Sequence, residues 1–323
     1  MANGKYFEKL NQYAVRIAAN VPKNLIGSGV ILLRHLGESP LLLTAAHVVS
    51  PLFQNTDTVA LCLGCMDGDG QVRTIEISVY LVREQKQGNG GEGETYIHPE
   101  YQAGSETKKE YSHDAAIVVL PWKEWMGTLD GFVLKDEIIG ETLDGWGFPG
   151  STDSEIKAAS ADILAGKKDI HGTVSNRVSK AKKFSFTYNG GSWERNVTRD
   201  SFMIGFSGSG LFEMQQDSIA LKGLISCGYG DKSAGTMLWA SSSSLFIEMM
   251  EQFNLEIRCP HSFQCYKEKI VQSIFDTRKE ARRFFTDWAE KLIEDHHLQP
   301  ENFDSDTEIE LPCISNRKVC DDF

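Results

Sequence analysis

The sequence predicts an all-β fold, and two observations support this prediction. Short stretches of alternating or β-branched apolar residues recur along most of the chain, a pattern typical of half-buried strands. Turns rich in glycine, proline and asparagine separate these stretches and interrupt regular structure. The length of 323 residues fits one large all-β domain with an extension, or two domains.

The N-terminal part of the chain is expected to be a short amphipathic segment followed by strands. Residues 6–19 carry apolar side chains at roughly helical spacing, which predicts a helix. Residues 26–33 and 41–44 are expected to pair as a hairpin, and alternating strands to follow at 58–63 and 72–82.

The later part of the chain is expected to contain loops, further strands, helices and an acidic tail. Residues 88–93 form a glycine-rich loop, and the polar, alanine-rich residues 151–169 predict a surface loop or short helix. The serines of 241–244 suit the N-cap of a helix over 242–255. Strands are expected at 173–178, 183–188, 193–198 and 219–226, helical periodicity at 265–297, and an acidic, unpatterned tail at 300–323.

Composition and charge exclude some classes of function. A net charge of −12 argues against nucleic acid as the main partner, because phosphates repel such a surface. No stretch approaches the ~20 apolar residues of a membrane span, and the N-terminus lacks the apolar core of a signal peptide. The seven cysteines are scattered, which favours reduced thiols and a cytoplasmic location.

Three motifs bear residues that together perform nucleophilic chemistry. Ser207 stands among glycines in an apolar run, where a tight turn presents its hydroxyl and directs backbone N–H groups to the same point. His47 follows the apolar strand of residues 41–44 after two alanines, and Asp114 directly precedes the β-branched strand of residues 115–120. The order histidine, aspartate, serine is one of the known chain orders of the serine–histidine–aspartate triad.

These motifs resemble the signatures of trypsin-like serine proteases of the intracellular and bacterial type. The matching segments are Thr44-Ala45-Ala46-His47, His113-Asp114-Ala115-Ala116 and Gly205-Phe206-Ser207-Gly208-Ser209-Gly210. His98-Pro99-Glu100-Tyr101, the Gly-Trp-Gly of 145–147, the strand of 223–228 and the last strand of 235–241 match as well.

The resemblance covers about residues 25–257 and implies a particular architecture. It implies two six-stranded antiparallel β-barrels, one over about 25–135 and one over about 140–257, closed by a C-terminal helix. An N-terminal segment, 1–24, would precede them, and a helical extension with an acidic tail, 258–323, would follow.

The resemblance also implies a role for each motif residue. Ser207 would be the nucleophile, His47 the general base and then acid, and Asp114 the group that fixes the histidine tautomer. The N–H groups of Gly205 and Ser207 would form the oxyanion hole, and no cofactor or metal would be needed.

The residues around the nucleophile depart from the family in one respect and leave specificity open. Phe206 replaces a frequent acid, so activation through a new N-terminal amine is not expected, and something else, such as a partner or the C-terminal helices, would order the oxyanion loop. Ser201 would form the floor of the pocket and favour large apolar side chains, whereas a slip of one residue would bring in Asp200 and favour arginine or lysine. The pocket walls would include Ser226, Gly228 and Gly235.

The function expected from these features is that of a serine endopeptidase acting on protein substrates. A regulatory protein that binds the C-terminal extension, and a place in a bacterial defence (antiviral) or stress module, are expected by analogy. The alternatives are a catalytically idle binding or scaffold module with a protease fold, and an esterase-like hydrolase.

The cysteines at 62, 65, 259 and 265, with His261, match no standard zinc spacing, so free thiols are expected.

Overall fold

The structure is a computed structural model in which the main body of the chain is described. It describes residues 10–19, 26–34, 38–82, 90–102, 113–148, 164, 167–188, 205–214, 219–231 and 235–255. Several predictions fall on the remainder of the chain, namely those for residues 1–9, 151–163, 193–198 and 258–323.

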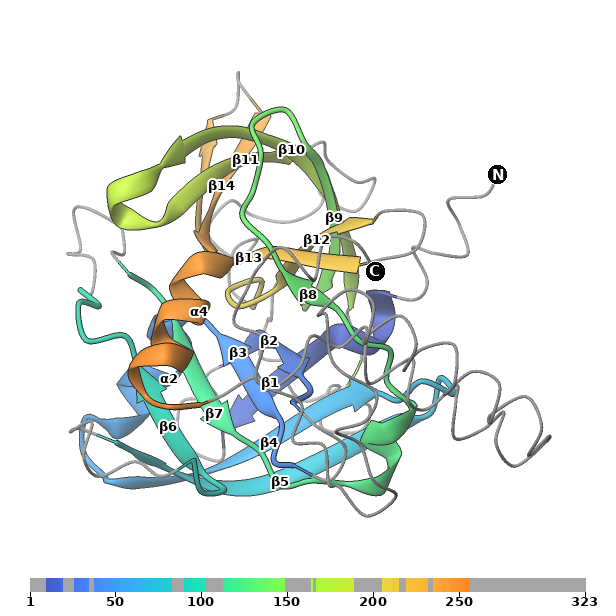
Figure 1. Ribbon diagram of the computed structural model, residues 1–323, viewed down its shortest axis with the longest axis vertical. Helices are drawn as coiled ribbons and strands as arrows, with labels where there is room; N and C mark the ends of the chain where they lie inside the picture. The colour runs from blue at the N-terminus through green and yellow to red at the C-terminus, as the bar shows by residue number, and fades with distance from the viewer. Residues whose placement is uncertain are drawn as a thin grey trace, which may run out of the picture. The chain divides into compact units, whose positions relative to one another are not determined.

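The N-terminal half of the described chain forms a closed β-barrel, drawn in colours from blue to green in Figure 1. Neighbouring strands are antiparallel except β5 and β6, which pair in parallel at Tyr80 and Glu94. In order around the barrel the strands are β1 (Ala14–Ala19), β2 (Ile26–Leu32), β3 (Leu41–Thr44), β7 (Ala116–Val119), β6 (Glu94–Ile97), β5 (Val72–Leu81) and β4 (Thr58–Met66).

The C-terminal half forms a second barrel, which β12 and β13 close by pairing with each other. The short strand β8 (Val133–Leu134) adds to its outside, parallel to β13. In order the strands are β12 (Gly210–Met214), β9 (Thr142–Gly147), β10 (Lys168–Val178), β11 (Lys183–Tyr188), β14 (Gly235–Ser242) and β13 (Ile219–Asp231). The predicted all-β, two-barrel trypsin-like fold is therefore confirmed.

The N-terminal segment corrects the sequence-based expectation. The helix predicted for residues 6–19 is absent from 10–19, where a 3-10 turn (Leu10–Tyr13) leads into β1. Val15 and Ile17 point into the barrel, whereas Arg16 between them places its guanidinium over the Phe148 ring, 5.7 Å from the centroid. The first barrel thus begins at Ala14 instead of near residue 25, and has seven strands instead of six.

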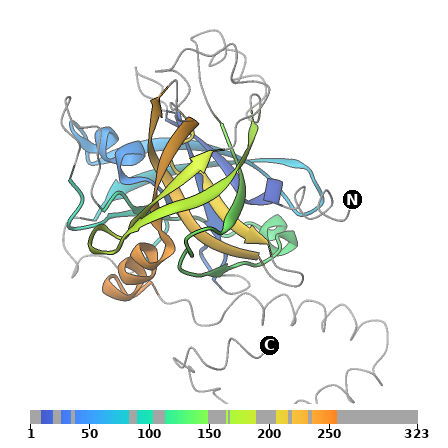
Figure 2. The same cartoon turned by 90° about the horizontal axis from the view of Figure 1, so that it is seen from above.

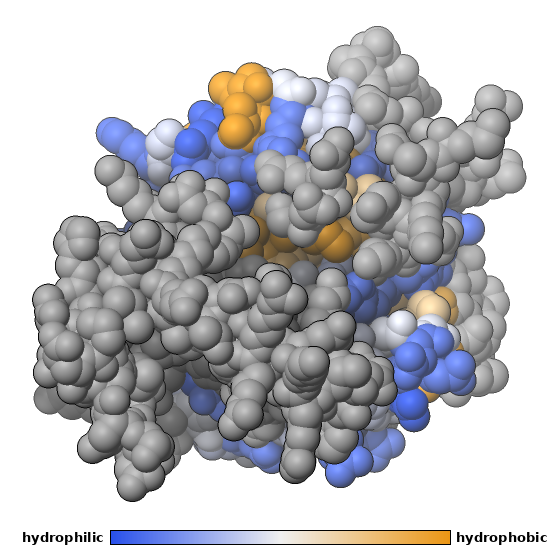
Figure 3. Space-filling view, turned by 45° about the vertical axis from the view of Figure 1, so that its right-hand side comes forward, coloured by the Kyte–Doolittle hydropathy of each residue, from blue (hydrophilic) through white to orange (hydrophobic). Residues whose placement is uncertain are grey.

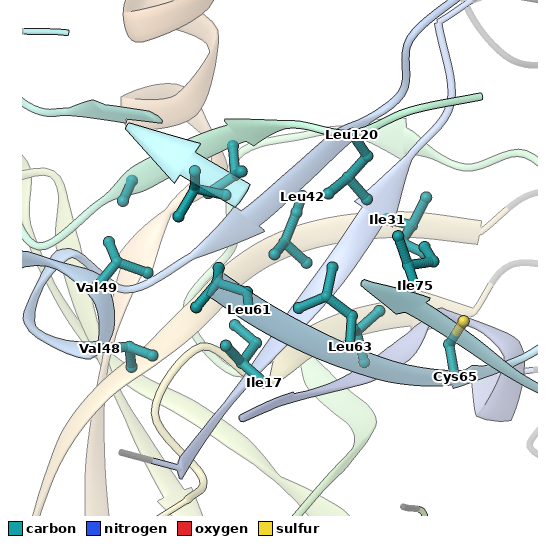
Figure 4. Packing of buried hydrophobic residues seen from close by; sticks show 14 of the residues in the cluster. Ile17, Ile31, Leu42, Val48, Val49, Leu61, Leu63, Cys65, Ile75 and Leu120 are labelled. Atoms are coloured by element: carbon teal, nitrogen blue, oxygen red, sulfur yellow. The ribbon is translucent and has the colours of Figure 1, made fainter. Parts of the chain in front are cut away.

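Apolar side chains fill each barrel and the space between them. In the first barrel, residues from alternating positions of several strands meet at the centre, among them Ile17, Leu42 and Leu61 (Figure 4). Between the barrels, the rings of Tyr13, Phe132 and Phe212 lie 5.1 to 5.5 Å apart, close enough for favourable aromatic contacts. The two halves therefore share one apolar interface.

Few helices accompany the strands. The short helix α2 (Ala46–Val49) follows β3, and α4 (Ser243–Gln252) follows β14 and packs against the second barrel with Leu245, Phe246 and Met249 (Figure 2). Single 3-10 turns occupy Ser50–Phe53, Glu124–Thr128 and Ser179–Ala181.

Polar and apolar residues both lie on the surface of the described part of the chain. On the face drawn in Figure 3, hydrophilic residues predominate among those coloured, with one apolar area at the top and another near the centre. Within the described ranges, no helix combines the length and the apolar character needed to span a membrane. The exposed large hydrophobic residues there are Val72, Tyr80, Ile138, Ile139 and Met237.

Candidate active site

Strand pairing in the first barrel brings His47 and Asp114 together. The strand β3 is fully buried and pairs with β7, so that Thr44 lies opposite Ala116. The end of β3 therefore lies beside the start of β7. His47, in the turn of helix that follows β3, and Asp114, two residues before β7, are held side by side by this pairing.

Asp114 is nearly fully buried, and both of its carboxylate oxygens accept hydrogen bonds. The backbone N–H of His47 donates to Oδ1 at 2.9 Å, and Nδ1 of the same residue lies 2.7 Å from Oδ2. The Ser226 hydroxyl also donates to Oδ2, and the Ser241 hydroxyl donates to the Asp114 backbone oxygen at 2.8 Å. A carboxylate accepts only, so Nδ1 of His47 carries a proton.

A strained turn directs this carboxylate. His113 has a φ of +49°, a left-handed conformation that is uncommon for residues other than glycine. Its ring stacks on that of His98 with centroids 4.9 Å apart, and its Nε2 lies 3.2 Å from the Glu100 carboxylate. These contacts of the ring hold the turn that precedes Asp114.

Ser207 lies on a tight turn that reaches His47 from the second barrel. Its Oγ is 2.7 Å from Nε2 of His47. Gly205, two residues before Ser207, and Gly208, directly after it, have φ values of +96° and +86°. Residues other than glycine rarely adopt these values. A Cβ at Gly208 would lie only 1.9 Å from the Ser28 backbone oxygen, so the turn requires glycine there.

The backbone of this turn is fixed on several sides. The Gly208 N–H donates to Ile225 at 2.7 Å, and the Ser28 N–H donates to the Ser207 carbonyl at 2.8 Å. In the described part of the chain, the N–H groups of Gly205 and Ser207 donate to no protein acceptor. Within these residues, no acceptor competes with a negatively charged oxygen for them.

Phe206 anchors the turn through its side chain. The residue is fully buried in the apolar interior of the second barrel, together with Leu143, Ile170 and Leu211. Its ring packs over Gly147, where a Cβ would lie 2.7 Å from the ring. Apolar packing therefore holds this residue of the turn in place.

The predicted specificity residues are only partly in view. Ser201 and Asp200 lie outside the described residues. In the hairpin of β13 and β14, Gly228 pairs with Leu238, and Gly235 pairs with Asp231. Ser226 turns its hydroxyl toward Asp114, and its carbonyl oxygen is 3.4 Å from Ser207 Oγ, so its side chain supports the acid. Pocket roles for these residues stay predictions.

Sequence analysis missed three hydroxyl residues that border the site. Ser28 contacts the turn of residues 205–208 around Ser207, called the nucleophile turn below. Thr44 donates to the Ser28 carbonyl at 2.8 Å, and Ser241 donates to the Asp114 backbone oxygen. The serine within Gly27-Ser28-Gly29 was the available signal, because a polar residue there interrupts an apolar strand.

Burial raises the pKa of the thiols of Cys62 and Cys65. Cys65 is buried, and burial raises the pKa of its thiol to about 12, so it stays protonated at neutral pH. Among the described residues, no cluster of three or more histidines, cysteines and acids has a metal-binding arrangement. Cys259, His261 and Cys265 lie outside them.

The two closed β-barrels define the class of architecture, the trypsin-like fold, and the hydrogen-bonded row of serine, histidine and aspartate joins residues of both barrels. Among solved structures, the chain is similar to the protease Anisep from Arthrobacter nicotinovorans, at 13% identity and a TM-score of 0.48, covering 77% of this chain and 98% of that one. It is also similar to Deg5, at 16% identity and a TM-score of 0.43, covering 76% of this chain and 90% of that one.

No family model matches the sequence, and no curated protein matches it.

Proposed function

We propose that this protein is a serine endopeptidase that hydrolyses peptide bonds through Ser207, His47 and Asp114. The observation that carries the proposal is the continuous row of hydrogen bonds from Ser207 Oγ through the imidazole to the buried carboxylate, with 2.7 Å at each step. Nucleophile, base and orienting acid are each within hydrogen-bonding reach of the next, as acyl transfer requires.

The geometry supports an acylation step in which His47 accepts a proton. With Nδ1–H bonded to Asp114, the Nε2 lone pair faces the Ser207 hydroxyl. As Oγ bonds to the carbonyl carbon, its proton passes to Nε2, and the carbonyl π electrons move onto oxygen. Asp114 stabilises the resulting imidazolium without taking a proton itself.

The turn around Ser207 supports the rest of the cycle. The N–H groups of Gly205 and Ser207 stabilise the oxyanion; removing one such donor costs about 3 kcal/mol of transition-state stabilisation. Collapse of the adduct breaks the C–N bond, and the leaving amine takes the proton from Nε2. Water then attacks the acyl-enzyme, with His47 again as base, and releases the carboxylic acid and free Ser207.

A fluorophosphonate probe and a mixed peptide library test this proposal. We expect wild-type protein to react at Ser207 and to cleave peptides, and Ser207→Ala to do neither. Ser78→Ala, which alters an exposed serine on the first barrel, is the matched control and should behave as wild type.

Two other outcomes would contradict the proposal that the protein is an endopeptidase. Folded wild-type protein that neither reacts nor cleaves contradicts the proposal and favours an idle scaffold. Hydrolysis of esters but not of peptides favours an esterase.

The same library tests the predicted specificity. Cleavage after large apolar residues supports a pocket with Ser201 at its floor, and cleavage after arginine or lysine supports Asp200. Control by a partner that binds residues 258–323, a cytoplasmic setting and a role in defence or stress remain part of the proposal. They rest on the sequence alone.

A further inference from the structure

Ser28 lies in β2 of the first barrel, yet most of its polar contacts are with the second. It is fully buried. Its hydroxyl donates to the Gly205 carbonyl oxygen at 2.6 Å and accepts the Phe148 N–H at 3.3 Å, and its own N–H donates to the Ser207 carbonyl at 2.8 Å. One residue thus contacts the nucleophile turn at two peptide groups.

The two peptide groups held by Ser28 enclose the one that bears the oxyanion donor. The Gly205 carbonyl belongs to the peptide before Phe206, and the Ser207 carbonyl belongs to the peptide after Ser207. The Ser207 N–H belongs to the peptide between them. A peptide group is planar, so the two hydrogen bonds of Ser28 fix the peptide groups before and after the one that bears the Ser207 N–H. Because the Phe206 ring is buried as well, the direction of this N–H is restrained from both sides.

Gly205 makes such a restraint necessary. With no side chain and a φ of +96°, it adopts either sign of φ at little cost, so its backbone alone does not hold the turn. The hydrogen bond from the buried Ser28 hydroxyl fixes the orientation of the Gly205 carbonyl, because a buried carbonyl without a partner would be costly.

Ser28 also connects the turn to the strand that carries the base. The Thr44 hydroxyl donates to the Ser28 carbonyl at 2.8 Å, and Thr44 is three residues before His47 in the chain. The row of contacts runs from the Gly205 carbonyl through Ser28 to the end of β3. Nucleophile and base, which come from different barrels, therefore share one support.

We propose that the Ser28 hydroxyl is a positioning residue that holds the nucleophile turn with its oxyanion donors aimed at the reacting carbonyl. The proposal rests on the proposed function, since it concerns the same site. Ser28 touches no reacting atom and acts through the peptide groups around Ser207.

The test compares Ser28→Ala with a matched variant. Ser243→Ala removes another fully buried hydroxyl that donates to a backbone oxygen, that of Leu221, away from the nucleophile turn. Both variants should lose similar thermal stability. We expect Ser28→Ala alone to lower kcat for a peptide substrate by about 10- to 100-fold with KM unchanged, less than the 10²–10³ of a deleted oxyanion donor.

A transition-state analogue gives a readout that a purely structural role would not move. A peptidyl trifluoromethyl ketone forms a tetrahedral adduct with the serine and places a negative oxygen at the donors. Its affinity should fall in Ser28→Ala by the same factor as kcat and stay unchanged in Ser243→Ala. Equal kcat and analogue affinity in Ser28→Ala and wild type would overturn the inference.

A second variant covers the case in which Ser28→Ala does not fold, and a probe reaction separates failure of this inference from failure of the proposed function. If Ser28→Ala does not fold, Ser28→Cys, which keeps a weaker donor, should show a reduced kcat at unchanged KM; a wild-type kcat in this variant also overturns the inference. Failure of the wild-type protein to react with fluorophosphonate at Ser207 would instead refute the proposed function. The two failures are therefore distinguishable.

Discussion

At the scale of single residues, the environment of Asp114 determines how the site can work. Its carboxylate is buried and receives donors from the His47 backbone and ring and from Ser226. Each of these groups only donates in this arrangement, so the acceptor-only character of an ionised carboxylate is required on both oxygens.

Asp114→Asn should disable the base while leaving the fold in place. The amide NH₂ would donate to Nδ1 of His47 and force the tautomer whose Nε2 bears a proton, so that Nε2 cannot accept one from Ser207. We expect kcat to fall about 10⁴-fold, measured with the best library peptide. Asp69→Asn, on an exposed loop, is the control, and comparable activity in Asp114→Asn and wild type would rule out the assigned role.

The residues that sequence analysis identified and those that it missed differ in how their partners are arranged. His47, Asp114 and Ser207 stand in short local patterns of small residues beside a strand, so they could be found from the sequence. Ser28 bonds a carbonyl 177 positions away, and no local pattern specifies such a contact. The strand pairing that creates it arises only in the folded barrels.

At the scale of elements, two segments show how tertiary contacts override local pattern. The segment around β1 satisfies both helical spacing (Leu10, Tyr13, Ile17) and strand alternation (Val15, Ile17), and pairing with β2 and β4 selects the strand. Ser242, one of the serines expected to cap α4, is its N-cap residue, but its side chain makes no capping hydrogen bond. The hydroxyls of Ser241, Ser242 and Ser243 donate instead to Asp114, Glu137 and Leu221, respectively. Distant acceptors compete successfully with the helix end.

The nucleophile turn yields a prediction at this scale. Phe206→Asp would place a carboxylate among Leu143, Ile170 and Leu211 instead of the ring that now fills this space. Because a buried, unpaired charge and a lost aromatic ring are both costly, we expect at least about 3 kcal/mol of destabilisation, measured by urea unfolding.

The activity of Phe206 variants should follow the packing of the turn. Phe206→Leu keeps an apolar side chain, so it should retain labelling at Ser207 where Phe206→Asp loses it. Undiminished stability of Phe206→Asp would mean that apolar packing is not what orders the turn.

At the scale of the whole molecule, the two barrels could be predicted because each motif marks a fixed place in such a fold. The strand count of the first barrel could not, because β1 lies outside the segment that resembles the family. The barrels are joined by the aromatic contacts of Tyr13, Phe132 and Phe212 and by the hydrogen bonds of Ser28. Stability and the geometry of the proposed active site thus depend on the same interface.

The stacked pair His98 and His113 connects the stability of the molecule to pH. His98 is buried, and its backbone N–H donates to the carbonyl oxygen of Ala115, the residue after Asp114. Its ring Nδ1 accepts the Glu100 backbone N–H at 3.1 Å. Burial, followed by the neighbouring His113 and by Lys182, outweighs Glu100 and lowers the pKa of His98 from 6.5 to about 4. The folded protein therefore holds this ring neutral at pH values where the unfolded chain protonates it.

This depressed pKa predicts that stability falls on acidification through a defined window. The contribution of neutral His98 is fully present above pH 6.5 and is lost as the pH falls to about 4, by at most about 3 kcal/mol. His98→Asn keeps an acceptor for the Glu100 N–H but does not titrate, so its free energy of unfolding in urea should vary less than that of wild type over this window. Parallel curves for the two proteins would show that the pKa of His98 is not depressed in the fold. Because His98 and His113 brace the turn before Asp114, the same acidification should also slow labelling of Ser207 more in wild type than in His98→Asn.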